Sequence, residues 1–298
     1  MHKVPTGIAR SVIALGVVAG LGGMSALAQN ARPVLLEDLD KPAGPVTIGD
    51  PKVMPNIVGI ALHMGVDEAM AVLRRAYPNR RVQTDMMPMP TVSKPAPYSM
   101  FLPQSEALNF ADVVAVDLTL PPEKQAVWRV ARYAMKQHLN RTTVLASLRE
   151  KYGKETVAFS QVNVATSATT DDRQIMTMYW LFDEMGRPAP APRALSDLLE
   201  CPFGSFQPTT PDFLLWETMP GNQPRVTNAW ATSSCIGVAV SFYYEPEPQP
   251  IIENIQIEAI NIPLAVRTAK ATTIWWKAAE ERLRREEIEK TKTAKPRL

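Results

Sequence analysis

The sequence has few of the residues that build most recognisable catalytic sites. Its 14 glycines include no GxGxxG or GxxxxGK[ST] pattern, the arrangements whose backbone amides hold nucleotide phosphates. No GxSxG or SxxK motif is present. Beyond residue 28 the histidines are His63 and His138, and neither lies in HExxH or another paired metal-ligand spacing. We therefore predict no cofactor, metal or motif-bearing active site. A Ser-His-Asp triad built from distant residues stays open, because geometry sets it rather than spacing.

An excess of basic charge is also lacking. The chain has 32 basic and 30 acidic side chains, and Lys3 and Arg10 lie in the N-terminal 28 residues, so the remainder carries 30 of each. No basic run precedes the C-terminal segment. Because binding to phosphate backbones needs clustered Lys and Arg, nucleic acid is not the expected partner.

The one long apolar run lies at the N-terminus and is short for a membrane span. It follows Lys3 and Arg10, extends from Val12 through Met24, and ends at the small-x-small site Ala26-Leu27-Ala28. This order is typical of a Sec-type signal peptide, residues 1–28, cleaved after Ala28. No cysteine follows to carry a lipid. We expect a periplasmic or secreted protein without a stable membrane anchor; an uncleaved anchor is the less favoured alternative, because the apolar core is too short.

Only two cysteines are present, Cys201 and Cys235. An even count in an exported chain predicts one disulfide, which closes a loop worth roughly 3–4 kcal/mol in the chain-entropy model. A redox-active pair would normally have its thiols two residues apart. The disulfide is therefore expected to be structural.

The rest of the chain divides into four further segments. Five prolines in residues 29–55 predict an extended arm, with the folded part beginning near Asn56. Residues 56–140 form a first α+β unit, residues 141–262 a second one with the disulfide loop, and residues 263–298 a C-terminal helix and charged tail. In that helix Trp275-Trp276 is predicted to be the only strong anchor, and Glu281 with Arg285 forms an i,i+4 pair.

Each unit is predicted to start with a helix. In the first, Asp67 begins a helix that ends at Pro78, a loose region covers Met86–Pro97, and an antiparallel hairpin follows at residues 111–120 and 127–135. In the second, Thr142 or Thr143 caps a helix that ends at Gly153. Strands are predicted at residues 156–162, 175–182, 236–244 and 255–262. A 75-residue offset aligns Leu73 with Leu148, Tyr77 with Tyr152 and Val82 with Val157.

Two groups of side chains are candidate contacts. Arg129 and Arg132 are three residues apart on a predicted strand and so point to opposite faces, one of them buried against Asp117 or exposed in a groove. They are the best candidates for anion or partner contact. The second group lies in the disulfide loop, where an exposed aromatic surface is the functional reading and sheet cover is the favoured one: Phe203, Phe206 and Trp216.

Two metal hypotheses are weaker. Methionines near His63 offer soft thioether ligands for cuprous copper, but no fixed spacing supports this and methionine commonly fills irregular core edges: Met64, Met86, Met87 and Met89. Four acidic residues suggest calcium, but the DxDxDG spacing is absent and a solvated turn is favoured: Asp171, Asp172, Asp183 and Glu184.

Three runs together carry a resemblance to known proteins: GIALHMGVDEAMAVLRRAYP, VVAVDLTLPPEKQAVWRVAR and TTVLASLREKYG. The chain resembles a class of uncharacterised exported proteins of Gram-negative bacteria. More distantly it is similar, over residues 56–160, to envelope modules of the BamE and β-lactamase-inhibitor-protein type. The shared feature is the helix opening at Gly65 with Glu68-Ala69. The resemblance implies tandem units of helices on an antiparallel sheet, and contact with another protein.

The predicted fold is therefore α+β, with tandem helix-on-antiparallel-sheet units, a long C-terminal helix and one disulfide. The predicted function is a non-enzymatic binding or scaffold module that contacts another envelope protein. The alternative is an envelope hydrolase whose active site is dispersed over the sequence. Periplasmic copper handling is a third class.

Overall fold

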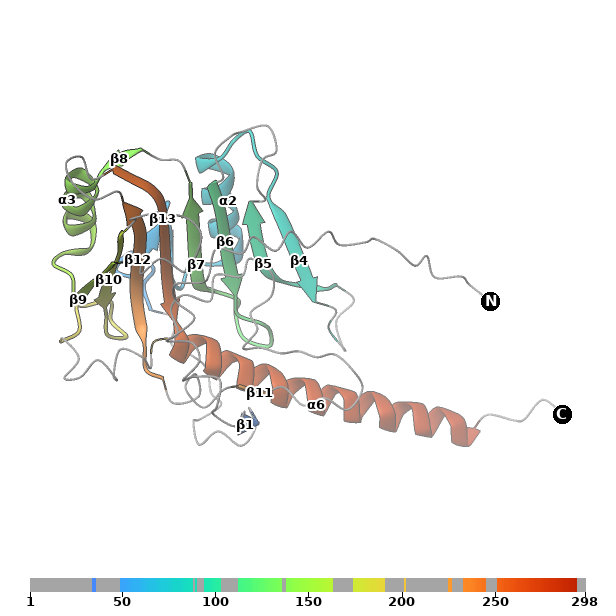
Figure 1. Ribbon diagram of the computed structural model, residues 1–298. Helices are drawn as coiled ribbons and strands as arrows, with labels where there is room; N and C mark the ends of the chain where they lie inside the picture. Colours follow the sequence, from blue (N-terminus) through green and yellow to red (C-terminus); the bar gives the residue numbers. More distant parts are fainter. Residues whose placement is uncertain are drawn as a thin grey trace, which may run out of the picture. The chain divides into compact units, whose positions relative to one another are not determined.

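A large antiparallel sheet holds most strands of the protein (Figure 1). The computed structural model describes residues 34–35, 49–87, 89, 94–102, 112–135, 138–162, 174–190, 201, 225–226, 233–244 and 251–293. Within them, the sheet has nine strands in the order β4-β5-β6-β7-β13-β12-β10-β9, with β8 paired to β13 beside this path. Each remaining strand belongs to one of two small pairs, β1 with β11 and β2 with β3.

The elements follow the chain in a simple order. The first half has β1 (Val34–Leu35), β2 (Asn56–Ile57), β3 (Ile60–Ala61), α2 (Val66–Ala76), β4 (Gln83–Met87), β5 (Ala96–Leu102), β6 (Asp112–Leu118) and β7 (Val127–Ala134). The second half has β8 (Leu139–Asn140), α3 (Arg141–Tyr152), β9 (Val157–Val162), β10 (Gln174–Leu181), β11 (Arg225–Val226), β12 (Ile236–Tyr244), β13 (Ile251–Asn261) and α6 (Ile262–Thr293).

The main sheet has two halves of the same layout. In each, a helix is followed by four antiparallel strands, namely α2 with β4 to β7 and α3 with β9, β10, β12 and β13. The last strands of the two halves, β7 and β13, pair in the centre from Ala134↔Ile255 to Arg129↔Ile260. The N-caps of the helices, Gly65 and Asn140, stand 75 residues apart, which is the offset seen in the sequence.

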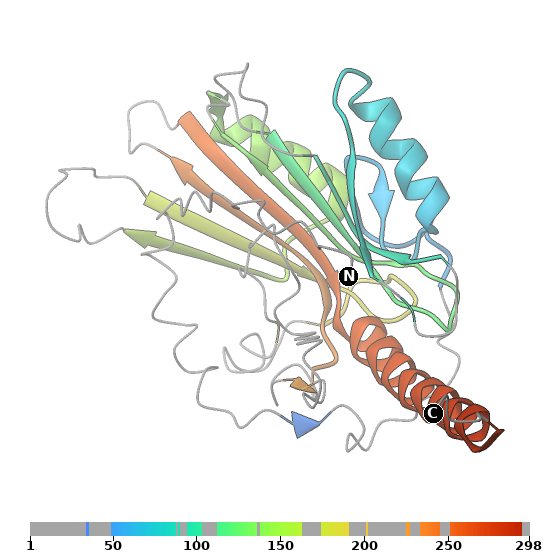
Figure 2. The same cartoon turned by 90° about the vertical axis from the view of Figure 1, so that its right-hand side faces the viewer.

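The two short helices lie on the same face of the sheet (Figure 2). Leu73 of α2 and Leu148 of α3 belong to one apolar core together with inward side chains of the central strands, including Val130, Val240 and Phe242. Alternation along each strand sends every second side chain into this core, which is why the sequence pattern located the strands. We call this side of the sheet the helix face. The other side carries neither α2 nor α3, and we call it the open face for that reason alone, since several of its side chains are buried.

Helix α6 begins directly where β13 ends. Asn261 caps it, because its Oδ1 accepts the Leu264 amide at 2.9 Å. Its first turns are buried against Trp128 and Cys235. The prediction that Trp275-Trp276 is the only strong anchor is therefore wrong, since buried side chains run from Ile262 to Thr273. From Glu280 onward the described side chains are exposed. None of the described helices combines the length and apolar character needed to cross a membrane.

Several predicted elements are confirmed. The hairpin of residues 111–120 and 127–135 is β6 and β7, paired antiparallel. The strand predicted at 236–244 is β12. The bond between Cys201 and Cys235 is present. Gly153 ends α3 with a positive φ of 81°, as its place after the helix predicted.

Two further predictions were wrong. The cap of α3 is Asn140, whose side chain accepts the Thr143 amide at 3.2 Å, and not Thr142 or Thr143 themselves. The region 86–97, expected to be loose, contains the end of β4 and the start of β5. Its prolines hid both strands, yet proline is tolerated at strand ends and on outer strands. Met54, two residues before the predicted start of the folded part near Asn56, is already buried.

Candidate functional site

Strand β7 carries the two candidate arginines to opposite faces of the sheet, as predicted. Arg129 pairs with Asp117 of β6 across the open face. Arg132 lies on the helix face, where it meets Asp112 of β6 and Tyr77 beyond the end of α2. The odd spacing of three residues decides this division, because strand side chains alternate.

On the open face, Arg129 is enclosed by two carboxylates. Its Nη1 donates to Asp117 Oδ2 at 2.8 Å, and its Nε donates to Glu258 Oε1 of β13 at 2.6 Å. The three residues are 6%, 4% and 2% exposed. Burial alone would lower the pKa of Arg129, but the charges of Glu258 and Asp117 raise it above its ordinary value. Arg129 is therefore a permanently charged residue of β7 that forms ion pairs with both neighbouring strands, β6 and β13.

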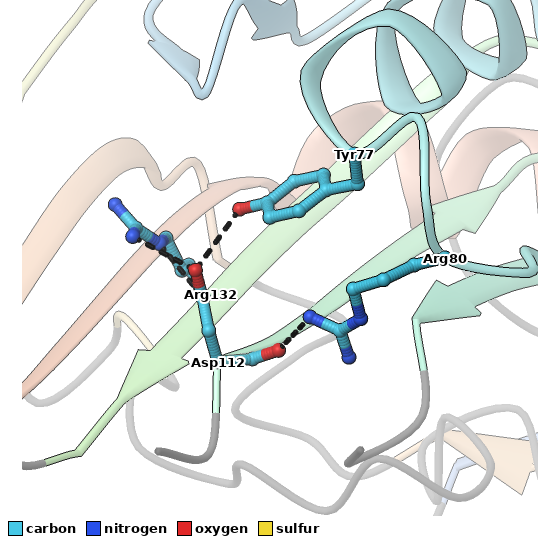
Figure 3. Close-up of polar contacts among 4 residues, drawn as sticks. All are labelled: Tyr77, Arg80, Asp112 and Arg132. Atoms are coloured by element: carbon cyan, nitrogen blue, oxygen red, sulfur yellow. Dashed lines mark hydrogen bonds and ion pairs between the residues drawn. The ribbon is translucent and has the colours of Figure 1, made fainter. Parts of the chain in front are cut away.

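On the helix face, Asp112 organises a cluster of four residues (Figure 3). Arg132 donates from Nε to Asp112 Oδ1 and from Nη2 to Asp112 Oδ2, both at 3.0 Å. Tyr77 OH donates to the same Oδ2 at 3.3 Å. Arg80 donates to the backbone carbonyl of Asp112. A guanidinium held through two parallel bonds has a fixed orientation.

The cluster is partly open to solvent. The side chains of Arg132 and Asp112 are 30% and 25% exposed. Burial would lower the pKa of Arg132, while the hydrogen bonds and charge of Asp112 raise it above its ordinary value. Burial and the Asp112 carboxylate raise the pKa of Tyr77, so its hydroxyl remains a donor near neutral pH. The geometry is thus fixed by the protein while one side of the guanidinium remains accessible.

A further cation from α3 adds positive charge to this region. The ammonium of Lys151 lies 5.2 Å from the ring centre of Tyr152. Burial, and next the positive charge of Arg132, lower the pKa of Lys151. Arg80 and Arg132 therefore both bond Asp112, and Lys151 of α3 adds a third cation whose charge acts on Arg132. Such an arrangement can bind an anionic group by charge-assisted hydrogen bonds.

The sequence did not single out Tyr77, Arg80 or Asp112 as members of a site. The 75-residue offset did mark Tyr77 and Tyr152, which now prove to stand at equivalent helix ends. Tyr77 OH reaches Asp112, and Tyr152 OH donates to the Asn56 carbonyl at 2.7 Å. Each tyrosine thus connects the end of its helix to another element by a hydrogen bond. Only Tyr77 does so through a charged group.

The two histidines do not form a catalytic arrangement with a serine or carboxylate among the described residues. His63 is 6% exposed and its Nε2 lies 2.6 Å from Asn261 Nδ2. Because Asn261 Oδ1 accepts from Leu264, Nδ2 must donate, so Nε2 accepts and Nδ1 carries the proton. Nδ1 lies buried beside Gly49 without a well-formed hydrogen bond within the described residues. His138 is exposed.

Burial of His63 lowers its pKa, an effect opposed by the Gly49 backbone and the Glu184 carboxylate. His63 also has a φ of 70°, a left-handed conformation that is uncommon for residues other than glycine. Its backbone amide donates to Val127 O at 2.7 Å. The residue therefore joins the β3–α2 turn to β7 and to the cap of α6, which is a structural role.

The structure does not bring the other candidate residues together in one site. Met64 belongs to the core beneath α2 and α3, whereas Met87 and Met89 pack in a different cluster near Trp275 and Trp276. Asp183 stabilises its own turn by accepting from the Arg187 amide and side chain. No group of His, Cys, Asp and Glu in the described part of the chain is placed to hold a metal ion. The remaining candidates lie outside the described residues: Asp171, Asp172, Phe203, Phe206 and Trp216.

Comparison with known proteins adds nothing to this geometry. No protein-family model, no curated protein and no solved structure matches the chain.

Proposed function

We propose that this protein is an exported, non-enzymatic binding module that contacts an envelope protein, and that Arg132 is its principal contact. The observation that carries the proposal is the orientation of the Arg132 guanidinium. Asp112 accepts from its Nε and Nη2, Tyr77 lies against it, and 30% of the arginine side chain is exposed. A partly exposed arginine held in one orientation loses little side-chain entropy when it binds, which is typical of interface hot spots.

The chemistry of the contact follows from the charges. With Arg80 bonded to the same aspartate and the charge of Lys151 acting on Arg132, the site favours a carboxylate of the partner over a cationic or apolar group. The neighbouring Tyr77 ring supplies rigid contact surface of the kind enriched at interfaces. The target is therefore an acidic side chain or chain terminus on another protein.

The repeated layout of the sheet supports the proposed likeness to tandem envelope modules. Each half has a helix followed by four antiparallel strands, with matching helix starts. Likeness of layout carries architecture to this chain and leaves the choice of partner to its own residues. The proposed export by a Sec-type signal over residues 1–28 places the partner in the envelope.

The alternative, a hydrolase with a dispersed site, requires a histidine that faces a nucleophile or carboxylate. In the described residues, His63 instead accepts from an asparagine amide and is buried. We therefore do not propose an activity that uses His63.

The test is affinity capture from an envelope extract with the purified protein as bait, comparing wild type with Arg132→Ala. The matched control is Arg149→Ala, because Arg149 is also a partly exposed arginine with a carboxylate partner, Glu155 at 2.6 Å. We expect a partner captured by wild type and by Arg149→Ala to be lost, by about tenfold or more, from Arg132→Ala. Equal capture by all three proteins would contradict the proposal.

A second comparison separates the positive charge of Arg132 from the fixed geometry of its guanidinium. Arg132→Lys keeps the positive charge but cannot reproduce the two parallel bonds to Asp112. We expect it to capture the partner less well than wild type. Full retention of capture by Arg132→Lys would show that net charge, and not the held guanidinium, is what the partner recognises.

A further inference from the structure

The main sheet ends in two outer strands that differ in their protection against pairing with another strand (Figure 1). Strand β4 forms one edge and β9 the other. An outer strand presents a row of backbone N–H and C=O groups that can pair with another chain, and folded proteins usually obstruct this row with charges, prolines or bulges.

The β4 edge has these obstructions. Its pairing with β5 is interrupted by a register shift between Asp85 and Met86. Asp85 adds a charge within the strand, and Pro88 and Pro90 follow it directly in the sequence. A bulge and a charge each disfavour pairing along the outer side, and the prolines stop its extension.

The β9 edge has none of them along its length. It pairs with β10 residue for residue, from Val157↔Tyr179 to Val162↔Gln174, without a register shift. Among the described residues, β10 is the only strand with which it pairs. From Thr156 to Thr170 the sequence has no charged residue, no proline and no glycine, and it is rich in valine and threonine.

We propose that β9 pairs antiparallel with β9 of a second copy of this protein, about a two-fold axis. Such pairing places a strand opposite itself, so its side chains must be self-compatible. Like charges directly opposite one another destabilise a strand pair, and the uncharged stretch avoids this. The exposed residues Ala158 and Ser160 are small enough to allow close approach.

Features beside the strand also favour an identical partner. Edge pairing with a different protein normally obtains its specificity from pockets for alternate side chains. Along β9, the half-buried Phe159 is instead packed against Tyr179 of β10, with ring centres 6.0 Å apart. These two rings form a small apolar surface beside the edge, and the same two rings of a second copy would enlarge it. The contact uses a different part of the sheet from Arg132, so it does not depend on the proposed function.

The test is analytical ultracentrifugation of the purified protein over a concentration series. We expect wild type to pass from monomer to dimer as concentration rises, and Ala158→Lys to need about tenfold or more higher concentration, because it places a charge on each of two facing strands. The control is Gln83→Lys, an exposed position on the β4 edge, which should dimerise as wild type does. A wild-type protein that stays monomeric throughout, or an Ala158→Lys protein that dimerises equally well, overturns the proposal.

Hydrogen exchange on wild type locates the contact without any substitution. We expect the outward-pointing amides of Val157–Val162, which are every second one because the others already bond to β10, to become protected as concentration rises, while those of β4 do not change. If β9 amides are equally protected at all concentrations, another segment of the same chain covers the edge, and the proposal fails. It also fails if protection appears only when envelope extract is added, since the partner strand then belongs to a different protein.

Discussion

Arg129 and Arg132 are the same residue type on the same strand, three positions apart, and each bonds a carboxylate on β6. They differ in the face they occupy. Arg129 lies on the open face between Asp117 and Glu258, with 7% of its side chain exposed. Arg132 lies on the helix face against Asp112, with 30% exposed. One strand thus presents two arginine–carboxylate contacts in very different surroundings.

The comparison shows that burial, more than chemistry, decides what an ion pair does. A buried charge left without its partner is costly, so the residues around Arg129 are mutually dependent. An ion pair that water reaches contributes little to stability, so Arg132 is available for recognition at small cost to the fold. The predictions below test this contrast from the largest expected effect to the smallest.

The largest effect should come from Arg129→Met. Removing the guanidinium leaves Asp117 and Glu258 buried without their shared cation, which should lower the free energy of unfolding by about 3–5 kcal/mol. Urea denaturation followed by circular dichroism measures this. A loss below about 1 kcal/mol would mean that the cluster is not energetically buried and would remove the contrast with Arg132.

Replacing the whole buried cluster should restore much of that loss. In the triple variant Arg129→Met, Asp117→Leu and Glu258→Leu, no charge remains to be desolvated, so stability should recover by about 2 kcal/mol or more relative to Arg129→Met. The same urea measurement applies. If the triple variant is less stable than Arg129→Met, the carboxylates contribute through other contacts rather than through their charge.

The His63–Asn261 pair extends the comparison to a buried group that is neutral but can be protonated. Because burial lowers the pKa of His63, the unfolded chain binds a proton below about pH 6.5 more readily than the folded one. Stability should therefore decrease as pH falls below this value, until the lowered pKa of the folded state is reached. Well above pH 6.5, where His63 is neutral in both states, it should contribute no pH dependence to the free energy of unfolding.

The measurement for His63 is the free energy of unfolding at pH 7.5 and at pH 5.5, in wild type and in His63→Asn. Asparagine tolerates the left-handed backbone at this position and does not titrate. Wild type should lose more stability than the variant over this interval. Equal losses in both proteins would place the pH dependence elsewhere, for instance among carboxylates.

The smallest effect on stability should come from Arg132→Ala. Because water reaches the Arg132–Asp112 pair, the free energy of unfolding should fall by no more than about 1 kcal/mol. Partner capture should nevertheless be lost. A fall of 3 kcal/mol or more, on the order expected for a buried pair, would place Arg132 with Arg129 as a structural residue.

Much of the fold was predictable from local patterns. Alternating apolar residues located β6, β7, β10 and β12, and helical spacing located α2 and α3. Strands β4 and β5 of the main sheet escaped because their signal was weak. Strand β4 has the polar sequence QTDMM, and the start of β5 is interrupted by Pro97, so neither shows a clear period of two. Both are held in place by pairing with a neighbour, which is a tertiary effect.

The site was predictable in part. The spacing of Arg129 and Arg132 fixed their opposite faces, and Asp117 was a plausible neighbour of the first. Glu258 was not, because it is 129 residues away and meets Arg129 only through the central β7–β13 pairing. Asp112 and Tyr77 were missed for the same reason, since they are 35 residues apart in the sequence and meet only in the folded chain.

The sequence by itself determined which residues alternate, where the helices lie and that the two cysteines pair. These are local or periodic properties, fixed by backbone sterics and side-chain patterning. The tertiary structure alone decided that both halves share one sheet, that Arg129 is enclosed while Arg132 is accessible, and that β9 lies at an edge. Each of these depends on which distant strands become neighbours, and burial and charge pairing follow from that choice.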